Sequence, residues 1–407
     1  MQKLFVQRCE TAKPNSIIIY IPLQNFSWAN LHPRASLFDI YSNVPQTIIN
    51  MTEAKELLEA KGIEVLTVLD VLKGDRKVLL EKAKEAVTYS LESDLCYSTE
   101  EEKAELEFFL SDEYKSNTLD HYSNDDLIEI ILNRPTCHLS SESINTHLIL
   151  KTVEFQPMGN MIFCRDHQII TSKGVIIGNL NCHQRKREVD LIRWFYELLK
   201  VPLIGEIKGE NKLEGGDFMI IKEDISLLGI GMRTNFGAAA YLMENDLLGT
   251  KIFGLVVDEN DFNQHRMHLD TIFNILSPEE VILLDMNTVK PKKIRDGKEV
   301  DIRRTVHIYE RKEVKKEYGN YELVKKIDFE EFLISEGYKI IKVTHEQQSD
   351  FMINFLNIGD GEVISPNKDM QSFLEKNGSK TKACYVEFKE VTKMYGAFHC
   401  ATQAIRY

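Results

Sequence analysis

The sequence lacks a long hydrophobic run and has no excess of basic residues. Its 407 residues include 50 Lys and Arg against 63 Asp and Glu, a formal net charge of −13. Phosphate backbones are bound through clustered positive charge, so this balance argues against nucleic acid as the main partner. No stretch approaches the length of a membrane-spanning helix, and the first residues lack the apolar core of a signal peptide. We therefore expect no membrane association and a cytoplasmic location.

Cysteines are few, odd in number and scattered. The seven are Cys9, Cys96, Cys137, Cys164, Cys182, Cys384 and Cys400. No two of them form a Cys-x-x-Cys pair, which excludes a zinc ribbon, and their spacing is not that of a disulfide framework. Free thiols fit a reducing compartment, and we expect neither a bound metal nor another cofactor.

The length and composition fit a soluble globular protein, with either two domains or one domain carrying an insertion. Hydrophobic residues make up 43% of the chain and charged residues 28%. The apolar run 16–22 ends at a proline and predicts a buried strand. Helical spacing over 47–61 is stopped by Gly62, and 63–69 predicts the next strand. Strand, helix and strand in this order indicate an α/β fold.

The texture changes between about residues 72 and 132, which are rich in Glu, Lys, Leu and Ala. Helical phasing recurs at 78–91, 101–109 and 124–132, and no strand pattern interrupts it. We predict an all-helical insertion domain over 72–147. The catalytic α/β domain would then consist of 1–71 and 148–407.

Strand and helix patterns alternate again from residue 148 onward, which favours an α/β architecture. The segment 290–316 is dense in basic residues and predicts a solvated face or loop. Helices are expected at 188–199 and 236–244. Strands are expected at 175–177, 218–221, 226–230, 252–257, 281–284, 306–309, 339–343, 351–355 and 384–388.

Two short acidic motifs could contribute to a site. His268 and Asp270 would point to the same side of a strand, where a carboxylate and an imidazole form an acid/base pair. Glu214 and Asp217 flank two glycines, which allow close backbone approach at a bend. Taken alone, the first motif is common by chance and the second reads equally as a tight acidic turn.

Two further motifs complete the constellation. Asp166 lies six residues after Asn160, and taken alone it reads as a strand-end partner of Arg165. Cys400 lies in a Gly-x-x-His-Cys tail, where an isolated cysteine is usually structural. A reactive cysteine needs nearby positive charge to become a thiolate. A bound guanidinium would supply that charge, and opposed carboxylates would hold it.

Together these residues resemble the arginine deiminases of the guanidine-modifying (pentein) superfamily. The similarity runs from about Pro157 to the C-terminus, and more weakly through 37–39 and 47–69. Matched motif residues, in the family's order, are Asn160, Phe163, Arg165 and Asp166; Arg185 and Glu188; Glu214 to Asp217; Gly229, Gly231, Arg233 and Thr234; Met267 to Phe273; and His399 to Thr402.

The resemblance implies a role for each matched residue. Asp166 and Asp270 would chelate the guanidinium, and Cys400 would attack its carbon. His268, oriented by Glu214, would protonate the departing ammonia and then activate water. The substrate's α-carboxylate would be held by Asn160, Arg185 and Arg233. The implied activity is hydrolysis of free L-arginine to L-citrulline and ammonia, without a cofactor.

The resemblance also implies a five-bladed, pseudo-symmetric α/β propeller with the helical insertion after its second strand. A homo-oligomer, either a dimer or a tetramer, is expected. One departure stands out, because the family usually carries an arginine five residues before the cysteine and this chain has Tyr395. A tyrosine hydroxyl can replace one hydrogen bond to a carboxylate but not the charge. A hydrolase of another guanidine such as agmatine or a modified arginine, an amidinotransferase, and a non-enzymatic member therefore stay open as alternatives.

Overall fold

The computed structural model describes residues 5–92, 97, 99–141, 148–258, 260–290, 302–316 and 318–407. The chain divides into two compact units. The larger unit comprises Met1–Ile21, Pro33–Val68 and Asn160–Tyr407, and the smaller comprises Pro22–His32 and Leu69–Gly159. Among the described residues, no helix combines the length and the apolar character needed to cross a bilayer.

Among the described residues, the strands of the larger unit form five sheets. Their strands are β1 (Ser16–Ile19), β2 (Glu64–Thr67), β6 (Gln168–Ile170), β7 (Val175–Ile177), β8 (Leu203–Glu206), β9 (Phe218–Lys222), β10 (Ile225–Ile230), β11 (Ile252–Val257), β12 (Phe273–Ile275), β13 (Glu280–Leu284), β14 (Thr305–Lys316), β15 (Gly319–Asp328), β16 (Lys339–Val343), β17 (Leu356–Asn357), β18 (Glu362–Ser365), β19 (Lys382–Tyr385) and β20 (Gln403–Ile405). The strand orders are β2-β1-β20, β6-β7-β8, β15-β14-β11-β10-β9, β12-β13-β16 and β17-β18-β19.

The five sheets repeat one pairing pattern. In each, a strand pairs in parallel with one neighbour and antiparallel with the other; these strands are β1, β7, β10, β13 and β18. A strand paired on both edges satisfies its backbone groups internally, so it can be buried on both faces. Accordingly, all four residues of β1 are buried. The chain thus builds the larger unit from repeated mixed α/β sheets.

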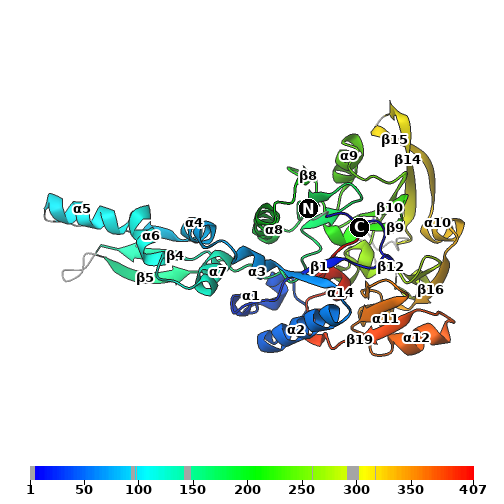
Figure 1. Cartoon of the computed structure of the whole chain (residues 1–407), viewed down its shortest axis with the longest axis horizontal. Helices are drawn as coiled ribbons and strands as arrows, with labels where there is room; N and C mark the ends of the chain where they lie inside the picture. The colour runs from blue at the N-terminus through cyan, green and yellow to red at the C-terminus, as the bar shows by residue number, and fades with distance from the viewer. Residues whose placement is uncertain are drawn as a thin grey trace. The chain divides into compact units, whose positions relative to one another are not determined.

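The first and last strands of the larger unit lie side by side. Ser16 of β1 pairs with Ile405 of β20, and Ile18 pairs with Gln403. Cys164 Sγ donates to Ile18 O in β1 and Ala401 O in helix α14 (Phe398–Ala401), each at 3.2 Å. Figure 1 shows the same arrangement, with blue β1 beside red α14. Residues far apart in the sequence are thereby brought to one place around Cys400.

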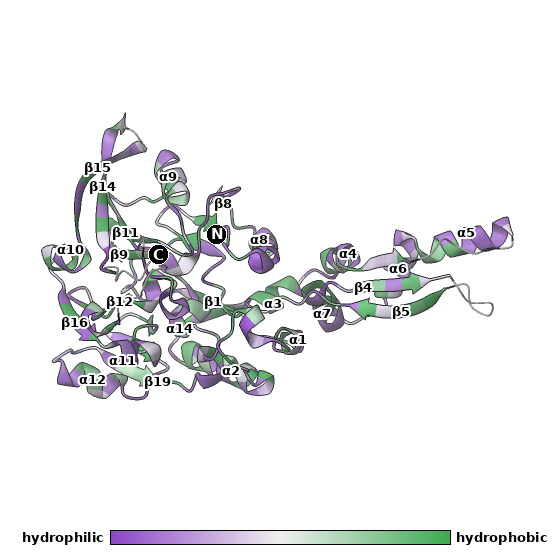
Figure 2. Cartoon of the chain, turned by 180° about the vertical axis from the view of Figure 1, so that it is seen from behind, coloured by the Kyte–Doolittle hydropathy of each residue, from purple (hydrophilic) through white to green (hydrophobic). Residues whose placement is uncertain are grey.

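Helices flank the sheets of the larger unit, and α2 illustrates how the sequence sets their ends. Asn43 caps α2 by accepting from Gln46 N at 3.0 Å, and Gly62 follows its end with φ +74°. Figure 2 shows much hydrophilic colour on α8 and α12. The longer helices of this unit are α2 (Val44–Ala60), α8 (Lys186–Leu198), α9 (Phe236–Glu244), α10 (Phe329–Ser335) and α12 (Met370–Lys376).

Two hydrophobic clusters hold the larger unit together. One gathers the buried side chains of β12, β13, β16 and α10, with Phe273 and Phe329 in edge-to-face contact at 5.2 Å. The other packs α9 against β9, β10 and β11, with Phe253 and Tyr321 at its centre. Burying aromatic side chains of this size is among the largest favourable contributions to folding. The loops that hold the polar motifs therefore start from rigid, packed strands.

The smaller unit is a mixed helix and sheet structure, so the prediction of an all-helical insertion is wrong. Helices α4 (Arg76–Ala86), α5 (Glu100–Phe109), α6 (Asp112–Leu119) and α7 (Asn124–Asn133) are joined by a sheet of β3 (Thr88–Leu91), β4 (Thr136–Ser140) and β5 (Ile149–Glu154). The helical spacing in the sequence continues to residue 91. The helix nevertheless ends at Ala86, because Val87 adopts an extended backbone conformation with φ −83° and ψ 129°. Val87, Thr88 and Tyr89 are residues that favour strands, and β3 pairs with β4 almost fifty residues later.

Two other sequence expectations differ from the structure. The segment 351–355 is not a strand, because Phe351 adopts φ +57° and the strand β17 begins only at Leu356. The basic segment 290–316 is not simply a loop, because 305–316 form β14 and pair with both β11 and β15. Residues 291–301 of that segment lie outside the described residues. The other strands predicted from residue 148 onward correspond to observed strands. Their ends differ by at most three residues, except that β14 continues seven residues beyond the predicted end at Tyr309.

Candidate active site

Cys400 lies in the one-turn helix α14 and is held by an asparagine from a remote loop. Asn354 Nδ2 donates to Cys400 Sγ at 3.1 Å, while Asn354 Oδ1 accepts from Ala397 N at 2.9 Å and from Cys400 N at 3.3 Å. Cys400 Sγ in turn donates to Asp270 Oδ2 at 3.3 Å. The sulfur is thus fixed between an amide donor and a carboxylate.

The environment of Cys400 favours the neutral thiol. Burial, followed by the Asp270 and Asp166 carboxylates, raises the pKa of Cys400 well above its ordinary value. Desolvation disfavours a thiolate, and two nearby negative charges disfavour it further. A cation bound next to the sulfur would reverse both effects. The geometry therefore suits a nucleophile that ionises when a positive ligand arrives.

His268 and Asp270 lie on a turn rather than on the predicted strand. Asp270 is the middle residue of the short 3-10 helix Leu269–Thr271, and His268 is the N-cap of that helix. Both side chains nevertheless reach the same site, because Asp270 contacts Cys400 and His268 Nδ1 lies 3.8 Å from Asp166 Oδ1. The tight turn thus brings the imidazole and the carboxylate together by a different geometry from that of alternate strand positions.

His268 is placed between two carboxylates. His268 Nε2 bonds Glu214 Oε2 at 2.8 Å, and Nδ1 faces Asp166. Burial opposes a charged imidazole, but the Asp166 and Glu214 carboxylates outweigh it and raise the pKa of His268. Burial likewise opposes ionised Glu214, but the hydrogen bond with His268 and the charge of Arg233 hold the pKa of Glu214 below its ordinary value. The pair is therefore an imidazolium with a carboxylate, poised to donate a proton.

The Glu-Gly-Gly-Asp motif forms a short 3-10 helix over Gly215–Asp217 that packs directly on the site. A Cβ on Gly216 would lie 2.6 Å from His268 Nδ1 and 3.2 Å from Asp270 Oδ1. Asp217 Oδ1 accepts from Leu269 N at 3.0 Å, which ties this turn to the one that holds His268. The glycines are needed because the space beside them is occupied by polar atoms of the site.

Asp166, His268 and Asp270 each have one polar side-chain atom without a hydrogen-bond partner among the described residues. These atoms are Asp166 Oδ1, His268 Nδ1 and Asp270 Oδ1, and all are shielded from solvent. Two of them lie beside Gly216, and the third lies 3.8 Å from His268 Nδ1. A buried carboxylate oxygen without a partner is costly, and a planar cation that donates to it would remove that cost. This small polar locus next to Cys400 is suited to a guanidinium.

Arg185 is buried and already paired. Its Nη1 donates to Asp166 Oδ2 at 2.7 Å, its Nε donates to Glu188 Oε2 at 2.9 Å, and its Nη2 donates to Asn160 O at 3.3 Å. The second oxygen of Asp166 is therefore occupied by Arg185, which leaves Oδ1 for a ligand. In this structure Arg185 orients Asp166, and its predicted contact with a substrate carboxylate stays a prediction.

Asn160 and Arg233 border the same cluster. Asn160 Nδ2 donates to Ser36 O at 2.9 Å. Arg233 donates to Cys182 Sγ at 2.7 Å and to Gln264 Oε1 at 3.1 Å, and its Nη1 lies 3.7 Å from Glu214 Oε1. The structure thus connects all the predicted site residues through a chain of contacts. The substrate-binding roles of Asn160 and Arg233 stay predictions.

A buried charge network behind Asp270 was not foreseen from the sequence. His399 Nδ1 bonds Asp270 Oδ2 at 2.8 Å, and Glu10 lies 3.8 Å from His399 Nε2. Glu10 also pairs with Arg406 at 2.8 Å and with Arg165 at 3.6 Å. Burial raises the pKa of Asp270, but its hydrogen bond with His399 holds the pKa below the ordinary value. His399 adjoins Cys400 in sequence, so a role in the site could have been suspected for it. No sequence motif surrounds Glu10 or Asn354 that would indicate a role for either residue.

Tyr395 lies at the edge of the cluster, in a left-handed conformation with φ +70°. Its Oη donates to Asp39 Oδ1 at 3.0 Å and accepts from Arg34 Nη1. Its ring meets His265 edge-on at 4.8 Å. The residue that departs from the family pattern therefore contacts the segment around residues 34–39.

One group of the site has the composition of a metal centre. Ligand atoms of Asp166, Glu214 and His268 lie within 4.8 Å of one another. Glu214 Oε2, however, already bonds His268 Nε2, so a metal would have to displace that contact or use the remaining oxygens. The two unpartnered carboxylate oxygens, Asp166 Oδ1 and Asp270 Oδ1, equally suit an organic cation that donates hydrogen bonds in one plane.

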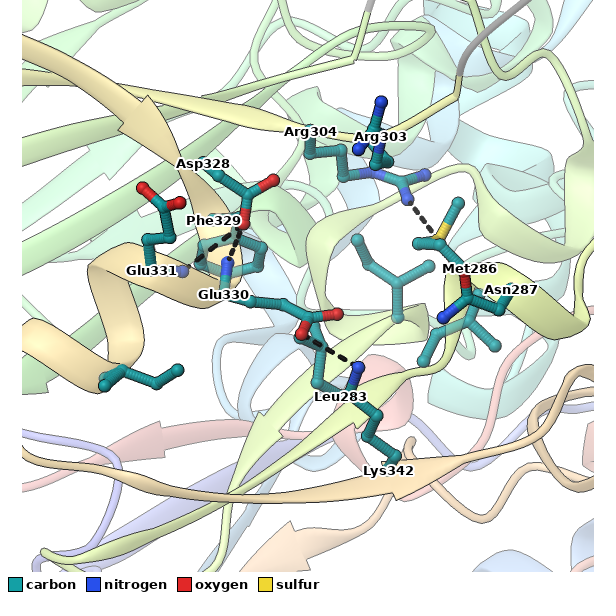
Figure 3. Close-up of a pocket in the computed structure, with 13 residues that line it drawn as sticks. Leu283, Met286, Asn287, Arg303, Arg304, Asp328, Phe329, Glu330, Glu331 and Lys342 are labelled. Carbon is teal, nitrogen blue, oxygen red and sulfur yellow. Dashed lines mark hydrogen bonds and ion pairs between the residues drawn. The ribbon is translucent and has the colours of Figure 1, made fainter.

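A separate cavity, of about 430 Å³, lies beside β13, α10 and β16 (Figure 3). Its charged groups are paired locally, with Lys342 bonded to Glu330 at 2.8 Å and Arg304 to Met286 Sδ at 3.3 Å. None of the predicted site residues lines it. The volume of a cavity alone therefore does not locate the chemistry of this chain.

Comparison with known protein families covers the residues of the candidate site. The family model of arginine deiminase matches residues 37–406. The chain belongs to the arginine deiminase family. It is 27% identical over 257 residues to arginine deiminase from Streptococcus agalactiae, a match that covers 59% of this chain and 60% of the relative. The chain thus matches less than two thirds of the length of that relative.

Solved structures identify the fold. The chain resembles a dimethylarginine dimethylaminohydrolase variant from Pseudomonas aeruginosa complexed with citrulline, with a TM-score of 0.53, 12% identity and coverage of 97% of this chain and 100% of that one. It also resembles an amidinotransferase from Microseira wollei, with a TM-score of 0.51, 12% identity and coverage of 99% and 97%. Both are pentein-fold proteins, so the mixed α/β fold of this chain is the pentein fold.

Proposed function

We propose that this chain hydrolyses free L-arginine to L-citrulline and ammonia, with Cys400 as the nucleophile. The decisive observation is the set of unpartnered atoms, Asp166 Oδ1, His268 Nδ1 and Asp270 Oδ1, beside the buried thiol. Membership of the arginine deiminase family supports the assignment. The citrulline complex of a structural relative adds that a ureido product fits a site on this fold.

Binding comes first in the proposed reaction. The guanidinium donates hydrogen bonds to Asp166 Oδ1 and Asp270 Oδ1, which fixes its plane and places its central carbon near Cys400 Sγ. Its positive charge favours the thiolate, so the thiol proton is released to solvent as substrate binds. Arg185 and His399 hold the opposite oxygens of the two aspartates, at 2.7 and 2.8 Å, which keeps the ligand-facing oxygens in place.

Chemistry then proceeds in two halves. The thiolate attacks the guanidinium carbon, and the tetrahedral adduct expels ammonia after the His268 imidazolium donates a proton to the leaving nitrogen. A thiouronium remains on Cys400. Neutral His268 next takes a proton from water, and the resulting hydroxide adds to the carbon. The hydroxyl proton of this adduct then passes to the departing sulfur, so the ureido product forms and Cys400 leaves as the neutral thiol. Glu214 keeps His268 oriented for both proton transfers, through its bond to Nε2.

A panel of guanidines tests the proposal. Purified protein is incubated with L-arginine, agmatine and dimethylarginine, and ammonia and ureido product are measured. L-Arginine should give both products in equal amounts, and Cys400→Ala should give neither. Cys137→Ala is the matched control, because Cys137 lies in β4 of the smaller unit. Absence of any ureido product from L-arginine would overturn the proposal.

Hydrolysis of agmatine is the second candidate, and Tyr395 is the observation that favours it. Agmatine lacks the α-carboxylate, so it would not need the cation that Tyr395 replaces. The presence of Arg185 and Arg233 in the cluster favours arginine instead. A higher kcat/KM for agmatine than for arginine would decide for the second candidate.

We further propose that the five sheets of the larger unit are the five blades of a pseudo-symmetric propeller. Their repeated pairing pattern supports this proposal. The insertion domain, predicted over 72–147, would extend to Gly159, because β5 pairs with β4, and the larger unit would form the catalytic domain. A cytoplasmic homo-oligomer, dimer or tetramer, fits the free thiols and the acidic charge. Light scattering tests the oligomeric state, and fractionation of cells tests the location.

A further inference from the structure

The segment from Pro33 to Asp39 lies against the candidate substrate-binding residues. It begins with the 3-10 helix Pro33–Ser36. Ser36 O accepts from Asn160 Nδ2 at 2.9 Å, and Ala35 O accepts from Gln184 Nε2 at 2.9 Å. Two consecutive carbonyl groups thus fasten the segment beside Asn160. Arg34, the residue just before them, is therefore placed at the border of the site.

Arg34 is held by Tyr395 and Asp39. Its Nη1 donates to Tyr395 Oη, and its Nη2 lies 2.9 Å from Asp39 Oδ1. Tyr395 Oη donates to the same Asp39 oxygen at 3.0 Å. The three side chains form a closed triangle, and the His265 ring supports Tyr395 from the side at 4.8 Å. Tyr395 thus positions an arginine that belongs to a distant part of the sequence.

Arg34 differs from the other two arginines of the cluster in its accessibility. Its side chain is 65% exposed, whereas those of Arg185 and Arg233 are each 4% exposed. The buried arginines are engaged with Asp166, Glu188 and Glu214. An exposed ion pair such as Arg34 with Asp39 is weak because water screens both charges, so the guanidinium can turn toward another carboxylate at little cost.

We propose that Arg34, held by Tyr395 and Asp39, is a specificity-determining residue that binds the carboxylate of an amino-acid guanidine. This inference rests on the proposed function and assigns the positive charge that Tyr395 itself cannot supply. Bidentate pairing of a guanidinium with a carboxylate gives both charge and geometry, which explains a preference for a substrate that carries a carboxylate. Tyr395 is then the support of that cation.

Kinetics on matched substrates test the assignment. Arg34→Ala should raise KM for L-arginine about tenfold or more with kcat within twofold, because a binding interaction shared by the ground and transition states is lost. kcat/KM for agmatine should change less than twofold. Arg34→Lys should recover part of the affinity for arginine, and Tyr395→Phe should raise KM for arginine without affecting agmatine. Arg311→Ala is the control, because Arg311 is also an exposed arginine paired with an aspartate.

The outcomes separate this inference from the proposed function. If wild type turns over arginine and Arg34→Ala keeps its KM, only the role of Arg34 is overturned. If wild type forms no ureido product from arginine, both the proposed function and the role of Arg34 are overturned. An equal loss of kcat/KM on arginine and agmatine in Arg34→Ala would assign Arg34 to structure rather than to specificity. Circular dichroism of each variant shows whether the fold is retained, and titration of Cys400→Ala with arginine and agmatine measures binding without turnover.

Discussion

At the scale of single residues, the site is defined by charged atoms that face a ligand on one side and a protein partner on the other. Asp166 gives one oxygen to Arg185 and Asp270 gives one to His399, and each keeps its other oxygen without a partner among the described residues. This division explains why so many ionised groups can be buried together. Each aspartate is stabilised from behind and presents a defined charge in front.

Removing one of these aspartates should weaken the transition state strongly. Asp270→Ala should lower kcat/KM for arginine by more than tenfold, a loss of about 1.4 kcal/mol or more, because the cation keeps only one of its two carboxylates. Asp246→Ala is the control, since Asp246 pairs with Arg311 and Lys173 away from the site. Steady-state kinetics on arginine measure both variants. A value for Asp270→Ala within tenfold of wild type would contradict the chelation of the guanidinium.

Asp217 makes a prediction about stability and pH. Burial raises the pKa of Asp217 to about 7, above an unfolded value of about 3.9. A raised pKa means that the folded state prefers the proton, so this group's contribution to stability is present below about pH 4 and is lost as the pH rises to about 7. Asp217→Asn removes that loss. Urea unfolding should show the variant gaining stability relative to wild type between pH 5 and pH 8. A difference that does not change with pH would contradict this assignment.

At the scale of elements, the sequence pattern predicted those helices and strands whose signals are local. The helix at 44–60 could be predicted because its apolar spacing ends at Gly62, and β1 because five apolar residues, 17–21, precede Pro22. The strands of the smaller unit could not, because β3 is four residues long and depends on pairing with β4. The strand predicted at His268 and Asp270 is a 3-10 turn instead, because Leu269 N donates to Asp217 Oδ1, 52 residues earlier, and no local pattern reports that contact.

The Gly215–Asp217 turn gives a prediction at this scale. Gly216→Ala would place a methyl group 2.6 Å from His268 Nδ1 and 3.2 Å from Asp270 Oδ1. Such contacts force the imidazole or the carboxylate to move, so kcat should fall by at least about tenfold while the protein stays folded. Kinetics and circular dichroism together measure this. Wild-type kcat in Gly216→Ala would mean that the space beside Gly216 is not the ligand site.

At the scale of the whole molecule, the site is assembled from segments that meet only in the folded chain. Asp166, Glu214, His268, Asp270 and Cys400 were all candidates from the sequence, and the fold brings them into one cluster. Their motifs could be recognised because each is short and occurs in the family's order. Glu10, Arg34 and Asn354 were missed because their partners lie 389, 361 and 46 residues away, and no local pattern reports such contacts.

The same cluster separates a metal-free mechanism from a metal-dependent one. The proposed reaction uses Asp166, Glu214 and His268 to hold and protonate an organic cation, although these residues could also hold a metal ion. Dialysis against EDTA followed by assay in metal-free buffer should therefore leave kcat/KM for arginine unchanged. Loss of activity that is restored by added Zn²⁺ or Mn²⁺ would show that the cluster is a metal centre instead.

The central claim is that a guanidinium held by buried carboxylates reacts covalently with Cys400. The most direct measurement is rapid acid quenching of the enzyme during turnover of L-arginine, followed by intact-protein and peptide mass spectrometry. We predict an amidino-type adduct on the peptide that contains Cys400, which forms and decays as citrulline accumulates and is absent from Cys400→Ala. Citrulline formation by Cys400→Ala, or an adduct on another cysteine with none on Cys400, would contradict the account.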